Sequence, residues 1–191
     1  MTPDRKPVRK AVLPVAGLGT RMLPATKAVP KEMLPLLDKP MIQYAVEECH
    51  ASGIEEVIFV TGPGKSAIEA HFTADPALEA LLKQRGRHKD ADAIRLLSRI
   101  VRVSFARQEK PLGLGHAVLC AKSLVGREPF VVLLPDVFLL GTRPATAHLI
   151  EAYAESAGSV VAVESVPPER ISQCGIVAVE EDSPRGHLFR V

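Results

Sequence analysis

The sequence predicts an α/β fold, with a mostly parallel β-sheet and helices on both of its faces. Short apolar runs rich in β-branched residues alternate along the chain with segments of helical periodicity. Such alternation is typical of repeated βαβ units. Turns rich in glycine and proline follow several of the runs, as expected where a strand gives way to a helix.

Local patterns define the elements of the first half of the chain. Residues 11–16 form an apolar run that ends in a glycine-rich turn, which predicts a buried strand. Residues 40–52 carry apolar side chains at helical spacing behind a proline, and Gly53 follows as a stop, so a helix is expected. Residues 57–60 are β-branched and aromatic and predict a second strand, and residues 66–72 predict a second helix.

The second half continues the alternation. Residues 76–99 are mostly helical in pattern, with a charged middle at 85–92 that predicts a loop. Apolar or alternating runs predict the remaining strands, and periodic segments predict the remaining helices: strands at 100–106, 130–134, 160–163 and 176–179, and helices at 115–124 and 145–156. The run at 130–134 is fully apolar and is expected to be buried.

Composition narrows the class of protein. The chain has 191 residues and a formal net charge of +2, without a basic block, so neither nucleic acid nor a membrane is expected as the main partner. Residues 1–9 are expected to be a flexible segment and residues 10–191 one domain. The widely spaced Cys49, Cys120 and Cys174 predict free thiols, the first two packed on helices. No signal-peptide stretch is present, which favours a cytoplasmic protein.

The predicted topology indicates where a ligand binds. In parallel sheets of this kind, ligands bind at the carboxyl ends of the strands. Four segments follow predicted strands and are the candidates: 16–21, 61–65, 107–115 and 135–137.

Residues 17–21, Gly-Leu-Gly-Thr-Arg, form the first candidate site. The glycines allow backbone N–H groups to approach a phosphate closely, and Arg21 adds a planar fork of donors. The stretch lacks the Gly-Lys-Ser/Thr ending of a P-loop. A dinucleotide-binding turn requires a small residue where Met22 stands, and Asp38 lies in a turn rather than at the end of a second strand. A NAD-binding oxidoreductase is therefore disfavoured.

Residues 30–35, Pro-Lys-Glu-Met-Leu-Pro, form the second candidate site. Prolines at 24, 30, 35 and 40 stiffen the segment around them. A rigid loop that carries Lys27, Lys31 and Arg21 near a glycine-rich turn predicts a clamp for a polyanion.

Together these segments resemble a known family. Residues 15–27 (Val-Ala-Gly-Leu-Gly-Thr-Arg-Met-Leu-Pro-Ala-Thr-Lys), 30–35 and 38–40 (Asp-Lys-Pro) resemble the signature of the sugar-1-phosphate nucleotidylyltransferases. The variant is similar to the bacterial glucose-1-phosphate uridylyltransferases. This resemblance implies a Rossmann-like fold, transfer of a uridylyl group from UTP to glucose 1-phosphate, Mg²⁺ as the cofactor, and a homo-oligomer.

The resemblance also implies roles for individual residues. Arg21 and Lys31 would be catalytic, Asp136 would bind the metal, and Gly175 would contact the sugar. Val137 stands where many relatives have a second acidic residue, and Cys174 replaces a common Tyr. A Gln amide can pair with a pyrimidine edge. The nucleotide would be held by Ala16, Gly17, Gly19, Thr20, Glu32, Gln108 and Gly113. The family context argues for His116 less strongly than for Gln108.

The family's Glu-Lys-Pro segment and its second metal-binding Asp are not found in these residues. Residues 187–191 alternate like the start of a strand, so we expect a chain incomplete on its sugar-binding side, with little turnover by itself. Three alternatives stay open: a non-catalytic regulatory paralogue or fragment that binds nucleotide, a thymidylyl- or cytidylyltransferase, and the disfavoured oxidoreductase.

Overall fold

The structure, a computed structural model, describes residues 6–139, 141–156 and 158–178. The chain divides into two compact units, unit 1 (Met1–Ala147) and unit 2 (His148–Val191). Helix α7 (Ala145–Glu155) crosses the boundary between them in sequence. The first unit contains the sheet and the candidate sites around it.

Unit 1 is built on a four-stranded sheet in which every neighbouring pair of strands is parallel. The expected α/β class with a parallel sheet is therefore confirmed. Val12 pairs with Ile58 on one side and with Val132 on the other. The strand order is β5 (Arg102–Arg107), β4 (Glu56–Thr61), β1 (Lys10–Pro14) and β6 (Phe130–Val132).

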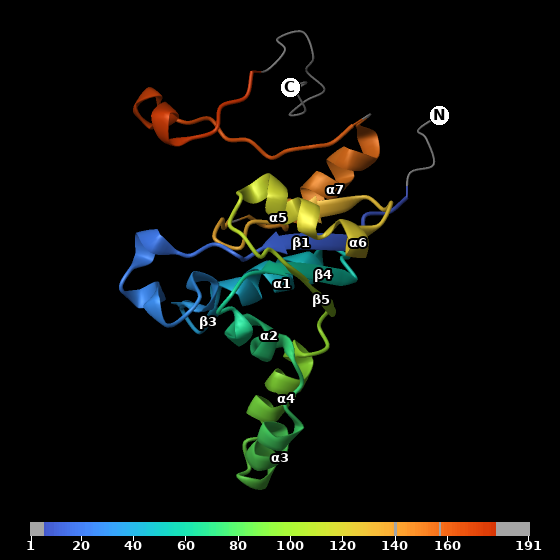
Figure 1. Ribbon diagram of the computed structural model, residues 1–191. Coiled ribbons are helices and arrows are strands. Elements are labelled where there is room, and N and C mark those ends of the chain that lie inside the picture. Colours follow the sequence, from blue (N-terminus) through green and yellow to red (C-terminus); the bar gives the residue numbers. More distant parts are fainter. Residues whose placement is uncertain (1–5, 140, 157, 179–191) are drawn as a thin grey trace. The chain divides into compact units, whose positions relative to one another are not determined.

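Helices cover both faces of this sheet (Figure 1). On one face lie α5 (Leu114–Cys120) and α6 (Lys122–Val125), and on the other lie α1 (Met41–Ala51) and α2 (Ser66–Phe72). Every residue of β4 is buried, as expected of a central strand that is covered on both sides. The α5–α6 face encloses one core cluster: Val12, Ile58, Val60, Ala106, Ala117, Ala121 and Val125.

Alternation along β4 sends its other side chains to the opposite face. Phe59 is fully buried there and stacks on Phe72 of α2, with ring centroids 5.2 Å apart, and on Phe105 of β5, at 5.6 Å. Burial of such a side chain contributes about 2–3 kcal/mol. Helix α1 presents its apolar stripe as predicted: Ile42, Ala45, Val46 and Cys49 are its buried residues. The three cysteines are free, as expected.

Two helix predictions need correction. The loop predicted at 85–92 is shorter, because α3 (Pro76–Gln84) and α4 (His88–Leu97) leave only residues 85–87 between them. The charged residues lie on the exposed surface of α4 and form short-range ion pairs, such as Arg95–Asp92 at 2.6 Å. Charge there is compatible with a helix that faces solvent. The helix predicted at 115–124 is divided into α5 and α6 at Ala121.

The strand predicted at 130–134 is shorter and less buried than expected. Strand β6 ends at Val132, and the side chains of Phe130 and Val132 are exposed. Its position explains this: β6 lies at the edge of the sheet and pairs with β1 alone within the described residues. Its apolar sequence indicated a strand but not its place in the sheet.

In the described part of unit 2, one 3₁₀ helix, η4 (Pro168–Gln173), follows α7. The strand predicted at 160–163 is wrong, and residues 176–178 are likewise not in a strand. A strand needs a partner for its backbone groups, and no strand stands among the described residues of this unit. Three predictions fall wholly or partly outside the described residues. They concern residue 179 of the strand predicted at 176–179, the start of a strand at 187–191, and residues 1–5 of the N-terminal segment.

Candidate functional site

The carboxyl ends of the strands bring the predicted ligand-binding segments of unit 1 to one edge of the sheet. Backbone hydrogen bonds beyond the strands hold these segments side by side. Val15 N donates to Val60 O at 2.9 Å, and Gln108 N donates to Thr61 O at 2.8 Å. The candidate segments 16–21, 61–65 and 107–115 therefore follow the neighbouring strands β1, β4 and β5.

The glycine-rich turn leaves β1 and enters a 3₁₀ turn, η1 (Thr20–Met22). Gly19 has φ of 66°, and a Cβ on it would lie 3.2 Å from Thr26 Cγ2 and 3.3 Å from Lys31 Cβ. Glycine is therefore required both by the backbone conformation and by the lack of space. Thr26 Oγ1 donates to Gly19 O at 2.8 Å and fixes the turn. Among the described residues, no atom lies within 4 Å of a Cβ built on Gly17, which leaves space for a ligand.

Basic side chains stand around this turn. Arg21 is exposed, and it makes no hydrogen bond or ion pair with any residue that the structure describes. The proline-rich segment forms two further 3₁₀ turns, η2 (Ala25–Lys27) and η3 (Lys31–Met33), and then a short hairpin of β2 (Pro35–Leu36) and β3 (Lys39–Pro40). The loop thus has a defined conformation, as its prolines predict.

Lys31 and Asp136 form an ion pair although they lie 105 residues apart in the sequence. Lys31 Nζ donates to Asp136 Oδ2 at 2.5 Å, and both side chains are partly exposed. Asp136 follows β6 at the carboxyl edge of the sheet. The structure therefore brings the predicted catalytic lysine together with the predicted metal-binding carboxylate.

The neighbouring Glu32 has a different environment. It is 1% exposed, and its Oε2 accepts from Lys65 Nζ at 2.9 Å, with Lys65 7% exposed. Glu32 Oε1 is buried and has no hydrogen-bond partner within the described residues. Glu32 was predicted to bind the nucleotide, whereas Lys65 was only the last residue of the candidate segment 61–65. A buried carboxylate requires a cationic partner, but the fold alone shows that Glu32 is buried.

Gln108 and Gly113, both predicted to bind the nucleotide, contact each other. Gln108 is 6% exposed, and its Nε2 donates to Gly113 O at 3.1 Å. Gly113 has φ of 95° and precedes α5, which suits glycine. Gln108 Nε2 also lies 2.9 Å from His116 Nδ1. The resemblance argued only weakly for His116, and the first turn of α5 brings it to the amide.

Gly175, the predicted sugar contact, lies in unit 2 and is exposed, with no atom within 4 Å of a Cβ built on it. Cys174, beside it, is partly buried and follows η4. The structure thus groups the nucleotide-binding candidates in unit 1, and Gly175 remains a prediction.

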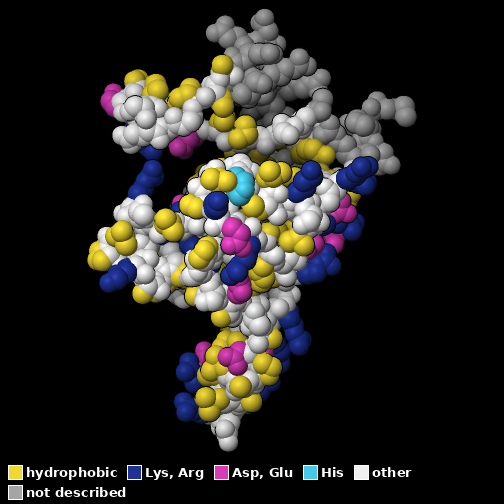
Figure 2. All heavy atoms as spheres, in the orientation of Figure 1, with side chains coloured by type: hydrophobic (Ala, Val, Ile, Leu, Met, Phe, Trp, Pro, Cys, Tyr) yellow, Lys and Arg dark blue, Asp and Glu magenta, His cyan; other side chains and the backbone are white. Residues whose placement is uncertain are grey.

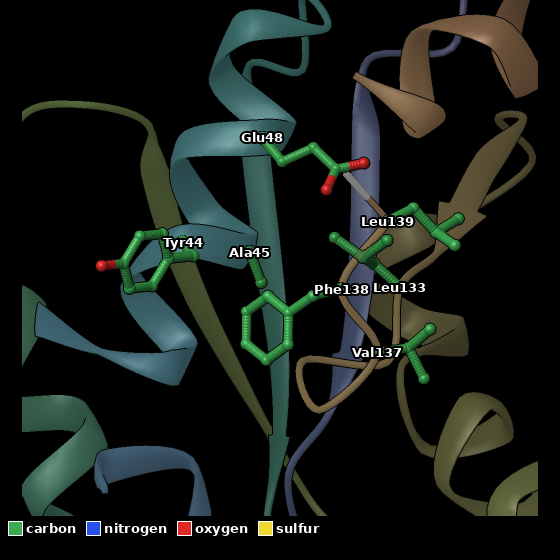
Figure 3. Close-up of a pocket in the computed structure, with 7 residues that line it drawn as sticks. All are labelled: Tyr44, Ala45, Glu48, Leu133, Val137, Phe138 and Leu139. Atoms are coloured by element: carbon green, nitrogen blue, oxygen red, sulfur yellow. The ribbon is translucent and has the colours of Figure 1, made fainter. Parts of the chain in front are cut away.

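An apolar pocket of about 160 Å³ is lined by residues of α1 and of the segment that follows β6 (Figure 3). The rings of Tyr44 and Phe138 meet edge to face in it, with centroids 6.1 Å apart. Glu48 is its one charged lining residue, and Glu48 Oε1 accepts from Thr146 N at 3.0 Å and Thr146 Oγ1 at 2.7 Å. No Lys, Arg or His is among the residues that line the pocket, so its lining does not suit a phosphate group. It is lined by Tyr44, Ala45, Glu48, Leu133, Val137, Phe138 and Leu139.

The surface carries charges of both signs. Figure 2 shows basic and acidic side chains interspersed on the face in view, without one continuous basic area. Within the described residues, no helix has the length and apolar character that crossing a membrane requires.

The comparisons with known proteins agree with this arrangement. The family model described as nucleotidyl transferase matches residues 10–188. The chain belongs to the nucleotidyl transferase family. The predicted resemblance to the sugar-1-phosphate nucleotidylyltransferases is thereby confirmed at the level of the family, and the Rossmann-like class is confirmed by similar solved structures.

Three similar proteins show how far the family likeness extends. UTP–glucose-1-phosphate uridylyltransferase YngB of Bacillus subtilis (strain 168) is 47% identical over 187 residues, which are 98% of this chain and 62% of that protein. A UTP-bound UGPase from Acinetobacter baumannii superposes with a TM-score of 0.83 at 45% identity, over 93% of this chain and 63% of that one. A UDP-glucose pyrophosphorylase complexed with UDP-glucose gives 0.80 at 36% identity, over 93% and 65%. This nucleotidyl transferase chain therefore spans less than two thirds of the length of these relatives.

Proposed function

We propose that the protein transfers a uridylyl group from UTP to glucose 1-phosphate, giving UDP-glucose and pyrophosphate. The observation that carries this proposal is the Lys31–Asp136 ion pair at the carboxyl edge of the sheet. In this proposal, the Lys31 ammonium of the pair binds phosphate and the Asp136 carboxylate binds a metal ion. The relatives support the choice of UTP and glucose, since they are named as UTP–glucose-1-phosphate uridylyltransferases or bind UTP or UDP-glucose.

In the proposed reaction, a phosphate oxygen of the sugar attacks the α-phosphorus of UTP. A P–O bond forms to the sugar phosphate, the P–O bond to the β-phosphate breaks, and pyrophosphate leaves in line. No covalent enzyme intermediate is needed, so catalysis consists of positioning and of neutralising charge. The backbone of Gly17, Gly19 and Thr20 and the free guanidinium of Arg21 would hold the triphosphate. The Lys31 ammonium has three hydrogens, so it can donate to a phosphate while it keeps Asp136.

Asp136 fits the proposed site for Mg²⁺. Its Oδ1 has no hydrogen-bond partner among the described residues, and its side chain is partly exposed. Mg²⁺ prefers oxygen ligands and keeps several of its waters, so it is commonly held by one or two carboxylates together with substrate phosphates. A bound Mg²⁺ would supply neutralising charge to the phosphate oxygens.

The base would be read by the Gln108 amide and by backbone groups of Ala16, Gly17 and Gly113. Glu32 keeps one buried, unpaired carboxylate oxygen, which supports a contact with a donor of the nucleotide or of an ordered water. Sugar contact by Gly175, a homo-oligomeric assembly and a cytoplasmic location stay predictions that rest on the resemblance and on the sequence.

The proposal is tested by pyrophosphate release from UTP and glucose 1-phosphate, together with equilibrium binding of UTP. Because the chain spans 62% of the length of its Bacillus relative, binding by the chain is the primary readout, and we expect little turnover from the chain alone. Binding of UTP without turnover in the longest natural form would favour the non-catalytic alternative. A chain that binds no UTP would contradict the proposal.

A further inference from the structure

The orientation of the Gln108 amide is fixed by two acceptors. Its Nε2 lies 3.1 Å from Gly113 O and 2.9 Å from His116 Nδ1. A carbonyl oxygen can only accept, so the nitrogen of the amide rather than its oxygen must face Gly113. The amide nitrogen has two hydrogens, one for each acceptor. Both donors of the Gln108 side chain are therefore engaged within the protein.

This contact also fixes the protonation of His116. A ring nitrogen that accepts from Gln108 cannot carry a hydrogen, so His116 is neutral with its hydrogen on Nε2. Cys120 Sγ lies 3.8 Å from the same Nδ1, one helical turn along α5. Its thiol is a weak donor and agrees with an accepting Nδ1.

The remaining polar atom of the amide is Oε1. Gln108 Oε1 has no hydrogen-bond partner within the described residues. It is not among the fully buried unpaired side-chain atoms, which in the described part are represented by Glu32 Oε1 alone. The site therefore presents an acceptor at Gln108, not a donor.

We infer that His116 is a positioning residue for base specificity: it holds the Gln108 carbonyl oxygen toward the nucleotide and so selects a base with a ring N–H. This inference rests on the proposed function. Uracil offers its N3–H to Gln108 Oε1, whereas N3 of cytosine has a lone pair and no hydrogen. To bind cytosine, the Gln108 amide would have to turn over. Its oxygen would then face two other acceptors, Gly113 O and His116 Nδ1.

The experiment compares the binding of UTP and CTP to the wild-type chain, His116→Phe and His116→Asn by calorimetry. His116→Phe keeps a ring but removes the acceptor, and we expect the preference for UTP over CTP to fall by about tenfold, the equivalent of one hydrogen bond. His116→Asn places an oxygen near the position of Nδ1 and should retain the preference. A phenylalanine variant with the wild-type preference, or an asparagine variant that loses as much as the phenylalanine variant, would overturn the role of His116.

A spectroscopic measurement on the wild-type chain decides the question even if a variant does not fold. Nitrogen-15 NMR of the imidazole should show an unprotonated Nδ1 and a protonated Nε2 for His116 at neutral pH. A protonated Nδ1 would overturn the inference. A wild-type chain that binds neither UTP nor CTP would overturn the proposed function together with this inference. In contrast, normal UTP preference with an insensitive His116 would overturn the inference alone.

Discussion

Lys65→Met tests how strongly the buried ion pair between Lys65 and Glu32 stabilises unit 1. Glu32 and Lys65 are 1% and 7% exposed, and they are joined at 2.9 Å. Removal of the lysine would leave a buried carboxylate with neither oxygen paired, since Glu32 Oε1 already lacks a partner. Breaking a buried pair in this way lowers the free energy of unfolding by about 3–5 kcal/mol. We expect a loss of that size in urea-induced unfolding.

Lys39→Met is the matched control for this substitution. Lys39 pairs with Glu47 at 2.6 Å, but these side chains are 29% and 34% exposed. The hydrogen bond that Lys39 donates to Glu47 raises the pKa of Lys39, yet solvent screens the pair. We therefore expect the control to lose only about 0–1 kcal/mol.

A Lys65→Met protein that loses no more stability than Lys39→Met at neutral pH would refute this account of the pair.

Three further predictions concern the site and the core. Lys31→Ala should lower turnover of the catalytically active protein by about a hundredfold or more, while its affinity for UTP changes only a few-fold. Substitution of an exposed lysine, Lys122→Ala, is the control. Undiminished turnover of the Lys31→Ala protein would remove Lys31 from the mechanism. Gly19→Ala should destabilise the chain by about 1–3 kcal/mol and weaken UTP binding, because strain at φ of 66° is combined with contacts at 3.2–3.3 Å. Gly53→Ala, at φ of 81° in open space, should show the strain alone and leave UTP binding unchanged. Burial raises the pKa of the Cys49 thiol to about 12. At mildly alkaline pH, Cys120 and Cys174 should therefore react with a thiol reagent first, and Cys49 should react only when the chain unfolds. Equally fast labelling of all three cysteines would contradict this.

The elements that could be predicted from the sequence are those with a strong local signal. The apolar runs predict β1 and β4, and the periodic segments predict α1 and α2, within a few residues of their observed bounds. The predicted strands at 160–163 and 176–179 carry the same kind of apolar pattern and were wrong within the described residues. An apolar, alternating pattern indicates that a segment is suited to a β-strand, but whether a partner strand lies beside it depends on the tertiary structure.

The candidate site shows the same limit. Lys31 and Asp136 could be selected separately, one from a stiff loop and one from the end of a strand, and the parallel topology then brings them together. Lys65 and His116 could not be selected in that way. Each one acts through a contact with another side chain, Glu32 or Gln108, and only the fold determines those contacts. Short motifs therefore identify candidate ligand-binding groups, but not the side chains that contact those groups in the fold.

We propose that the carboxyl edge of the sheet in unit 1 binds UTP. The most direct measurement is equilibrium binding of UTP, dTTP, CTP and ATP to the chain under identical salt and Mg²⁺ conditions. The account predicts that UTP binds most tightly and that Gln108→Ala reduces this preference. Failure to bind UTP, or equal binding of all four nucleotides, would contradict it.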